Sequence, residues 1–294
     1  MSKISIIIVT YNSEALIDEC LESIFKYNDI DKDLEVIIVD NMSKNADSMF
    51  VSIKQKFGDE IVLIKNNKNG GYGQGNNVGI RIAQSPIIMI MNPDVRIDSK
   101  IFNRVYRSFK DESVIMVGFQ QFLSNVKRGY SFFTKKSSIA NLFLDKMFYF
   151  LNVYLQKYMC FTGACFFVRK SAFEKVGLFD ENIFLYGEEV DIHNRLQNHF
   201  PGSKMIYNKS MRYIHLIDDR IHKEEDGVRQ FNSFIYLCKK NHLDIVKECN
   251  MRLGYYKALR FKDRLLRKEV TVLDKTIKMI EDYLKDYKVE DSSL

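Results

Sequence analysis

Short apolar runs alternate with segments of helical spacing along the first half of the chain. The runs are rich in β-branched side chains and end abruptly at polar residues, as buried strands do. They cover Ile4–Val9, Leu34–Val39, Ile61–Lys65, Ile87–Met91 and Val114–Phe119. Between them, apolar side chains recur every three or four residues, which predicts helices after Ser13, at 46–57, towards Ala83 and at 101–109. This alternation predicts an α/β fold with a mostly parallel central sheet and flanking helices.

The strand at Ile87–Met91 runs directly into Asn92-Pro93-Asp94. Pro93 has no N–H to donate to a sheet ladder, so we expect the strand to end there. Asp94 then lies at the carboxyl edge of the sheet, where open α/β folds bind their ligands. A carboxylate at this edge suits a divalent cation such as Mg²⁺, which keeps few protein ligands. The alternative, that Asp94 caps a turn, stays open at this point.

Polar clusters also follow the three earlier strands. They are Thr10-Tyr11-Asn12, Asp40-Asn41-Met42-Ser43 and the glycine-rich stretch Asn69–Asn77. Glycines let a ligand approach the backbone, and N–H groups at a helix start favour phosphate. The stretch lacks the Gly-Lys-Ser/Thr of a Walker loop and is not a dinucleotide fingerprint, because it follows the third strand. We expect these clusters and Asp94 to converge on one edge of the sheet.

Composition indicates a folded protein of ordinary type. Hydrophobic residues make up 46% of the chain, aromatic residues 13%, and there are only 3 prolines and 14 glycines. The five cysteines show no zinc-type spacing and are interpreted as reduced thiols of a cytoplasmic protein. The start Met1-Ser2-Lys3 leads straight into an expected strand, so we expect no signal peptide, and we find no apolar run long enough to span a bilayer.

Positive charge is concentrated near the C-terminus. The net charge is +6, and residues 252–278 hold nine Lys or Arg against three acids, so the rest of the chain is formally neutral. An anionic partner such as a membrane surface or nucleic acid is one interpretation, and a solvated helix face is the one we favour. Nucleic acid is set aside because the basic segment lacks aromatic platforms in a β context.

Six motifs resemble those of family 2 glycosyltransferases, in particular the rhamnosyltransferase-like enzymes of bacterial surface polysaccharide assembly. The motifs lie in order and with fitting spacings at Ser5–Asn12, Val36–Ser43, Asn69–Asn77, Met91–Val95, Phe161–Arg169 and Phe179–Ile192. The resemblance implies a GT-A fold, a nucleotide-sugar donor and a divalent cation, Mg²⁺ or Mn²⁺. It covers roughly residues 4–240, so we expect a catalytic domain at 1–240 and a basic helical extension at 241–294.

The resemblance also assigns candidate binding residues. Those implied for the nucleotide are Thr10, Tyr11, Asn12, Glu14, Asp40, Asn41, Gly71, Asn76 and Asn92. Asn92-Pro93-Asp94 occupies the place of the family's Asp-x-Asp motif, so Asp94 is the expected metal ligand. His215 resembles a downstream histidine that joins the metal or diphosphate, and an ordinary structural histidine is the alternative. Arg220, His222 and Lys223 are further candidates to meet the diphosphate.

An inverting sugar transfer needs a carboxylate to take the proton of the acceptor hydroxyl. The family has an adjacent Glu-Asp for this purpose, and Glu188-Glu189 stands in its place here. Glu189 is therefore the expected base, with a longer side chain than the usual Asp, and Asp191 is the second candidate. Acids near Glu188 also suit a helix N-terminus on electrostatic grounds alone.

Two later segments have helical spacing. The apolar residues from Phe143 to Tyr154 predict either an ordinary packed helix, which we favour, or a mobile flap that docks a lipid carrier. From Leu266 to Tyr287 apolar residues follow a heptad stripe, which predicts a long helix. This stripe packs either on the catalytic domain or on a second subunit, and we predict the second, a homodimer.

The sequence thus predicts a metal-dependent, inverting glycosyltransferase that acts on a dTDP- or UDP-sugar. The expected acceptor is a hydroxyl of a polysaccharide or lipid-linked saccharide, and rhamnose is the sugar first considered. We expect a cytoplasmic protein, with peripheral contact at the inner face of the cell membrane left open. The competing hypothesis is a non-catalytic nucleotide-binding scaffold, favoured by Asn92 and Glu189, which both depart from the family's usual acids.

Overall fold

The computed structural model describes residues 2–216 and 224–291 of the chain. It divides into two compact units. Unit 1 comprises Met1–Phe133, Tyr154–Phe184 and Glu188–Asp218, and unit 2 comprises Thr134–Val153, Leu185–Gly187 and Asp219–Leu294. The helix that precedes residue 240 belongs to unit 2, so this division differs from the one expected between 1–240 and 241–294.

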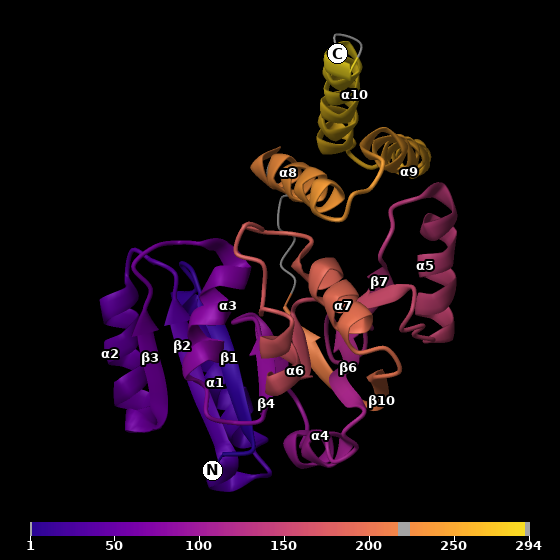
Figure 1. Cartoon of the computed structure of the whole chain (residues 1–294). Coiled ribbons are helices and arrows are strands. Elements are labelled where there is room, and N and C mark those ends of the chain that lie inside the picture. Colours follow the sequence, from indigo (N-terminus) through magenta and orange to yellow (C-terminus); the bar gives the residue numbers. More distant parts are fainter. Residues whose placement is uncertain (1, 217–223, 292–294) are drawn as a thin grey trace. The chain divides into compact units, whose positions relative to one another are not determined.

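Unit 1 is built on an eight-stranded, mostly parallel sheet with the order β3-β2-β1-β4-β9-β6-β10-β5 (Figure 1). Strands β1 to β4 are mutually parallel, whereas β9 runs antiparallel to both of its neighbours. The bounds are β1 Ile4–Thr10, β2 Leu34–Asp40, β3 Ile61–Lys65, β4 Ile87–Met91, β5 Val95–Ile97, β6 Val114–Phe122, β9 Cys165–Arg169 and β10 Lys204–His215, with β7 Phe132–Thr134 and β8 Met159–Phe161 in a separate pair. The predicted fold class is confirmed.

Helices cover both faces of the sheet because successive strand residues point to opposite sides. Ile4, Ile6 and Ile8 form a common core with the apolar side of α1. Ile7 points the other way, towards α3. The helices of unit 1 are α1 Glu14–Lys26, α2 Ala46–Phe57, α3 Gly71–Ile82, α4 Phe102–Ser108, α6 Lys170–Lys175 and α7 Glu188–His199, with short 3-10 turns at Asp31–Asp33 and Gly58–Glu60.

The glycine-rich stretch is mostly helix α3 itself, and its glycines allow close packing within the chain. A Cβ at Gly79 would lie 2.6 Å from Ile7 on β1, and one at Gly75 would lie 2.8 Å from Val9. Gly71 has a φ of +87°, and a Cβ there would lie 2.0 Å from the carbonyl oxygen of Phe184. We expected these glycines to let the backbone approach a ligand. The structure adds a second role, because Gly71, Gly75 and Gly79 let α3 pack closely against neighbouring segments.

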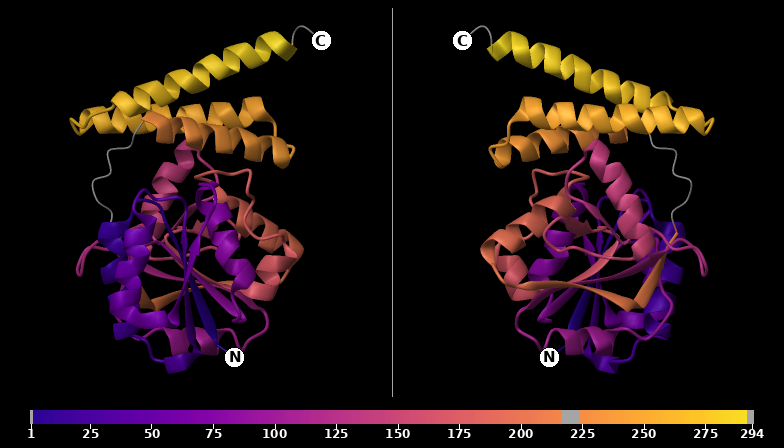
Figure 2. Two further views of the ribbon diagram at one scale, coloured as in Figure 1. Left: turned by 90° about the vertical axis from the view of Figure 1, so that its left-hand side faces the viewer. Right: turned by 90° about the vertical axis from the view of Figure 1, so that its right-hand side faces the viewer.

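Unit 2 contains α5 Ile139–Leu151, α8 Glu224–Lys240, α9 Ile245–Leu265 and α10 Thr271–Asp291. Figure 2 shows α9 and α10 as two long helices joined by a tight turn. The long helix expected over the stripe is present as α10, but it begins only at Thr271, because α9 ends at Leu265 and Arg267 adopts a left-handed φ of 54°. Ion pairs of Arg260 and Lys257 with acids of α10, at 2.9 and 2.7 Å, hold the two helices together.

The heptad stripe faces the interior of unit 2. Ile277, Ile280 and Leu284 are buried, and the last two pack with Phe231 of α8 and Cys249 of α9. The stripe that was expected to pair with a second subunit is thus covered by the same chain, because the break after α9 lets α10 fold back. This corrects the expected mode of homodimer formation.

Helix α5 is more exposed to solvent than expected. None of its residues is buried, and several of its large apolar side chains are exposed. The favoured interpretation as an ordinary packed helix is therefore wrong. The helix itself is regular, with the Ser138 side chain accepting from the backbone N–H of Asn141 at its start and Asn152 in the left-handed region at its end.

Candidate active site

The carboxyl ends of β1 and β2 meet at Thr10 and Asp40, which are paired in register and buried. The Thr10 hydroxyl donates to Asp40 at 3.0 Å, and the backbone N–H of Ser43 donates to the same carboxylate at 2.8 Å. The Ser43 hydroxyl in turn accepts from the backbone N–H of Asn12 at 2.7 Å. Asp40 therefore joins the two loops that follow these strands.

These loops present two exposed apolar side chains at the sheet edge. Tyr11 and Met42 are 54% and 56% exposed. Asn12 and Met42 both have positive φ, at 50° and 65°. Asn12 also accepts from the backbone N–H of Lys44 at 3.1 Å, so the strained turn is held from both sides. A flat apolar edge of this kind suits the face of a nucleotide base. Nothing in the sequence pattern singled out Met42 for that purpose.

Asn41 and Gly71 lie in a buried polar network beneath the edge. The Asn41 side chain donates to the carbonyl oxygen of Gly71 at 2.9 Å and accepts from Asn66 at 2.9 Å. Asn66 also donates to Gln74 at 2.6 Å. Asn41 and Gly71 thus fix the start of α3 and support the site from below.

Two other predicted residues keep a buried oxygen without a hydrogen-bond partner among the described residues. One is Glu14 Oε1 in the first turn of α1, and the other is Asn76 Oδ1 in α3. The Asn76 amide nitrogen donates to the carbonyl oxygen of Tyr72 at 2.9 Å, which fixes the orientation of its side chain. Such oxygens are costly to bury unless a ligand or water completes them.

Asp94 and His215 come from distant parts of the chain and meet at the same edge. Asp94 Oδ1 lies 3.2 Å from His215 Nε2, and Asp94 is buried. Strand β5 pairs with the end of β10, and the Leu216 N–H donates to the carbonyl oxygen of Asp94 at 2.9 Å. The backbone therefore places the two expected metal ligands side by side.

The Asp94–His215 pair supplies two donors of the kind that a divalent cation binds. Among residues 2–216 and 224–291, no group of three or more His, Cys, Asp or Glu side chains stands at metal-binding distance. Two donors, one carboxylate oxygen and one imidazole nitrogen, fit a Mg²⁺ or Mn²⁺ ion that takes its other ligands from phosphate oxygens and water. His215 Nδ1 is buried without a hydrogen-bond partner among the described residues.

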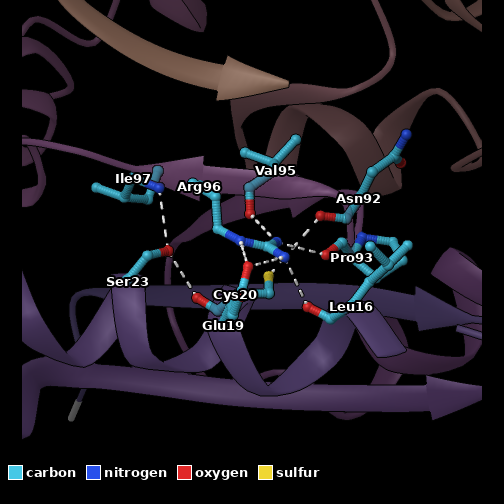
Figure 3. A network of polar contacts seen from close by, with 9 residues as sticks. All are labelled: Leu16, Glu19, Cys20, Ser23, Asn92, Pro93, Val95, Arg96 and Ile97. Carbon is cyan, nitrogen blue, oxygen red and sulfur yellow. Dashed lines mark hydrogen bonds and ion pairs between the residues drawn. The ribbon is translucent and has the colours of Figure 1, made fainter. Parts of the chain in front are cut away.

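The Asn92-Pro93-Asp94 turn is anchored by Arg96, which the sequence pattern did not indicate (Figure 3). The Arg96 guanidinium donates to the carbonyl oxygens of Pro93 and Val95 at 2.8 and 2.9 Å and to that of Leu16 on α1 at 3.0 Å. The Asn92 N–H donates to the carbonyl oxygen of Ala164 at 2.9 Å. The turn is thus fastened to α1 on one side and to the start of β9 on the other.

Glu189 lies in the first turn of α7, opposite the small-residue segment before β9. The backbone N–H of Gly163 donates to Glu189 Oε1 at 3.2 Å, and the Tyr72 hydroxyl donates to the carbonyl oxygen of Gly163 at 2.6 Å. A Cβ at residue 163 would lie 2.7 Å from the carboxylate, so a larger residue there would displace the Glu189 side chain from this position. Burial, together with Glu189 and Glu188, raises the pKa of Tyr72 well above its usual value, so Tyr72 remains a donor.

His193 fixes the position of Glu189 from within α7. The backbone N–H of Phe161 donates to His193 Nε2 at 3.1 Å, so Nδ1 carries the proton and donates to the carbonyl oxygen of Glu189 at 2.7 Å. Asp191, the second candidate base, is buried in an ion pair with Arg195 at 2.6 Å. Of the three acids in this turn, Glu189 is the only one whose residue is not buried. Arg220, His222 and Lys223 lie outside the described residues.

The eight-stranded sheet, with polar loops at the carboxyl ends of its parallel strands and an acid after β4, has the GT-A fold of nucleotide-sugar-dependent glycosyltransferases. The sequence profile described as "Glycosyl transferase family 2" matches residues 5–177, more than half of the chain. The chain therefore belongs to glycosyl transferase family 2. The resemblance seen in its motifs is confirmed at the level of the family, whereas the rhamnosyltransferase subgroup is not.

Two curated relatives and one solved structure illustrate the similarity. The chain is 35% identical over 118 residues, 40% of its length, to a poly(ribitol-phosphate) beta-glucosyltransferase of Bacillus spizizenii, and 23% identical over 283 residues, 91% of its length, to the minor teichoic acid biosynthesis protein GgaB of Bacillus subtilis. It spans only 19% and 30% of the lengths of these relatives.

The solved structure is a mannosyltransferase of Pyrobaculum calidifontis in complex with GDP-Man and Mn²⁺. It superimposes with a TM-score of 0.57 at 15% sequence identity, over 96% of this chain and 69% of the other. At this identity the likeness shows a shared fold.

Proposed function

We propose that the protein is an inverting, metal-dependent glycosyltransferase. It moves a sugar from a nucleoside diphosphate to a hydroxyl of a surface polysaccharide or its lipid-linked precursor. The single observation that carries the proposal is the meeting of Asp94 and His215, 3.2 Å apart, at the carboxyl edge of the sheet. The names of the two relatives, a poly(ribitol-phosphate) glucosyltransferase and a minor teichoic acid biosynthesis protein, support a polymer acceptor, and the first favours glucose over rhamnose. We therefore propose a UDP-hexose donor, with dTDP-rhamnose second.

In the proposed mechanism each side chain has a separate task. Thr10, Tyr11 and Asn12, with Asp40 behind them, form the edge against which the nucleotide lies. Asp94 and His215 would hold a divalent cation, which would supply positive charge against the departing diphosphate. Glu189 accepts the proton of the acceptor hydroxyl as its oxygen attacks the anomeric carbon. The Gly163 N–H and His193 keep the Glu189 carboxylate and backbone in place.

The decisive experiment measures release of nucleoside diphosphate from UDP-, dTDP- and GDP-sugars with Mn²⁺, Mg²⁺ or EDTA. We expect release from one donor, lost in EDTA. Glu189→Gln should lower kcat about 10²- to 10⁴-fold, the range of general base catalysis. Asp94→Ala should abolish metal-dependent release at any Mn²⁺ concentration tested. Asp111→Ala is the matched control, because this exposed aspartate lies at the start of β6, far along the strand from the site.

Other outcomes decide between the alternatives. If a nucleotide sugar raised the melting temperature but no turnover occurred in the presence of acceptor polymer, the non-catalytic scaffold would be favoured. Asn92, in place of the family's usual acid, is the feature consistent with that outcome. Full turnover by Glu189→Gln together with loss in Asp191→Asn would move the base to Asp191. Neither stabilisation nor release with any donor would refute the nucleotide-sugar proposal.

A further inference from the structure

Helix α5 of unit 2 presents an apolar face to solvent. Its large exposed apolar side chains are Ile139, Phe143, Leu144, Met147, Phe150 and Leu151. Phe143 and Phe150 are 70% and 81% exposed, far more than apolar aromatic side chains usually are. A contiguous apolar surface of this kind marks an interaction site on a folded protein.

Helix α5 is amphipathic, but here the apolar side is the one exposed to solvent. At 3.6 residues per turn, the exposed apolar side chains fall on one side of α5. The opposite side holds its polar contacts: Asp145 accepts from the backbone N–H of Thr134 at 2.8 Å and from its hydroxyl at 3.1 Å. At its start α5 also contacts α9, where the half-exposed Ile139 lies against Gly254. The polar side is therefore held by Thr134, and the apolar side from Phe143 to Leu151 is left exposed.

The charges around this face have one predominant sign. Residues 134–153 contain three lysines and one acid, and Lys146 is exposed beside the apolar face. Residues 252–278 of the same unit contain nine basic residues against three acids, although four of the nine pair with Asp263, Asp274 or Glu281. An excess of lysine next to exposed aromatic and aliphatic side chains complements anionic lipid headgroups above an apolar interior.

We propose that the apolar face of α5 docks on an anionic bilayer surface, with the helix lying in the plane of the interface. The 13 residues of α5 extend about 20 Å at 1.5 Å per residue, too short to cross the hydrocarbon core of about 30 Å. No described helix is long and apolar enough to cross a membrane. The proposal goes beyond sugar transfer and does not depend on it, because it concerns binding to lipid alone.

Because the chain contains no tryptophan, a single introduced indole reports on α5 directly. The probes are vesicles of equal parts phosphatidylglycerol and phosphatidylcholine, and vesicles of phosphatidylcholine alone, both free of polyprenol lipids. We expect the fluorescence of Phe150→Trp to shift to the blue and to be quenched by brominated acyl chains with the anionic vesicles. Val51→Trp, at a 55% exposed position on α2 of unit 1, is the matched control and should not respond.

Flotation of the full chain with the same vesicles supplies the energetic test. Phe143→Ser with Phe150→Ser should weaken binding at least about tenfold, because two exposed rings no longer enter the interface. Lys146→Gln should weaken it about fivefold, and added salt should weaken wild-type binding. Val51→Ser should bind as wild type. Circular dichroism confirms folding, which exposed substitutions leave intact.

Three results would overturn the proposal. The first is no binding of the wild type to anionic vesicles. The second is binding that the double serine variant retains. The third is a wild-type dimer in solution that the double serine variant converts to monomers, since a second copy of the chain would then be the occupant of the α5 face.

Discussion

At the level of single residues, several positions at the site either lack a side chain or have a strained backbone conformation. Gly71 needs its positive φ of +87° and its open space beside Phe184 to begin α3 at the sheet edge. Gly163 lets its N–H reach Glu189. Asn12 and Met42 hold left-handed turns at the ends of β1 and β2. Three such positions, Asn12, Met42 and Gly71, thus lie where the nucleotide is proposed to bind, although positive φ also occurs elsewhere in the described chain.

Gly71→Ala tests this point against Gly58→Ala. Both glycines have positive φ, but a Cβ at Gly58 has nothing within 4 Å, whereas one at Gly71 would lie 2.0 Å from a carbonyl oxygen. We expect Gly58→Ala to cost about 1–2 kcal/mol of unfolding free energy for its φ alone. Gly71→Ala should cost about 1–3 kcal/mol more through overpacking. Urea denaturation measures both, and equal losses would contradict the packing argument.

At the level of elements, α1 and the turn after β4 behave as one structural piece. Arg96 joins them through carbonyl groups of Leu16, Pro93 and Val95, and Ser23 of α1 accepts from the Ile97 N–H at 3.1 Å. Cys20 lies beneath, and burial raises the pKa of its thiol to about 12, so it remains protonated. The position of Asp94 therefore depends on how α1 packs, and not only on its own strand.

Arg96→Ala should lower the unfolding free energy by about 2–3 kcal/mol, because three carbonyl groups lose a charged donor. It should also raise the Mn²⁺ concentration needed for half-maximal turnover, since Asp94 would be less well positioned. Arg104→Ala is the control: this exposed arginine contacts Ser210 only at the surface of unit 1, and its removal should change stability by less than about 1 kcal/mol. Unchanged metal dependence in Arg96→Ala would show that the hydrogen bonds of Arg96 to Leu16, Pro93 and Val95 have no effect on the site.

At the level of the whole molecule, two hydrophobic cores of the described residues lie in different units. The first surrounds β1, β2 and β4 with α1, and the second lies between α8, α9 and α10. Ile280 is fully buried in the second core. Each core stabilises its own unit, and the apolar face of α5 belongs to neither.

Ile280→Ala should therefore destabilise unit 2 by about 2–5 kcal/mol, through loss of buried surface and a residual cavity. Lys278→Ala, two residues away and exposed on the same helix, should have little effect. Hydrogen exchange followed by mass spectrometry would measure the protection of backbone amides in each unit separately. Protection should fall in α8, α9 and α10 and persist in β1 and β4. A loss confined to α10 would contradict a shared core.

The fold of unit 1 was largely predictable because its signals are local. Apolar runs bounded by polar residues located β1, β2, β3, β4 and β6, and helical spacing located α1 and α2. The strands β5, β7 and β8 were missed because each has three residues, too few for a pattern. Helix α5 was located by its spacing, but its burial was misjudged because periodicity shows which side is apolar and not what covers that side.

Of the candidate site, the sequence by itself determined which acids follow which strands, and family motifs named Asp94, His215 and Glu189. Tertiary structure decided what these residues contact. It brought His215 to Asp94 through β5 and β10, and committed Asp191 to Arg195. It also folded the heptad stripe back onto its own chain. The physical reason is that strand and helix patterns are set by neighbours a few residues away, whereas pairing and burial depend on segments far apart along the chain.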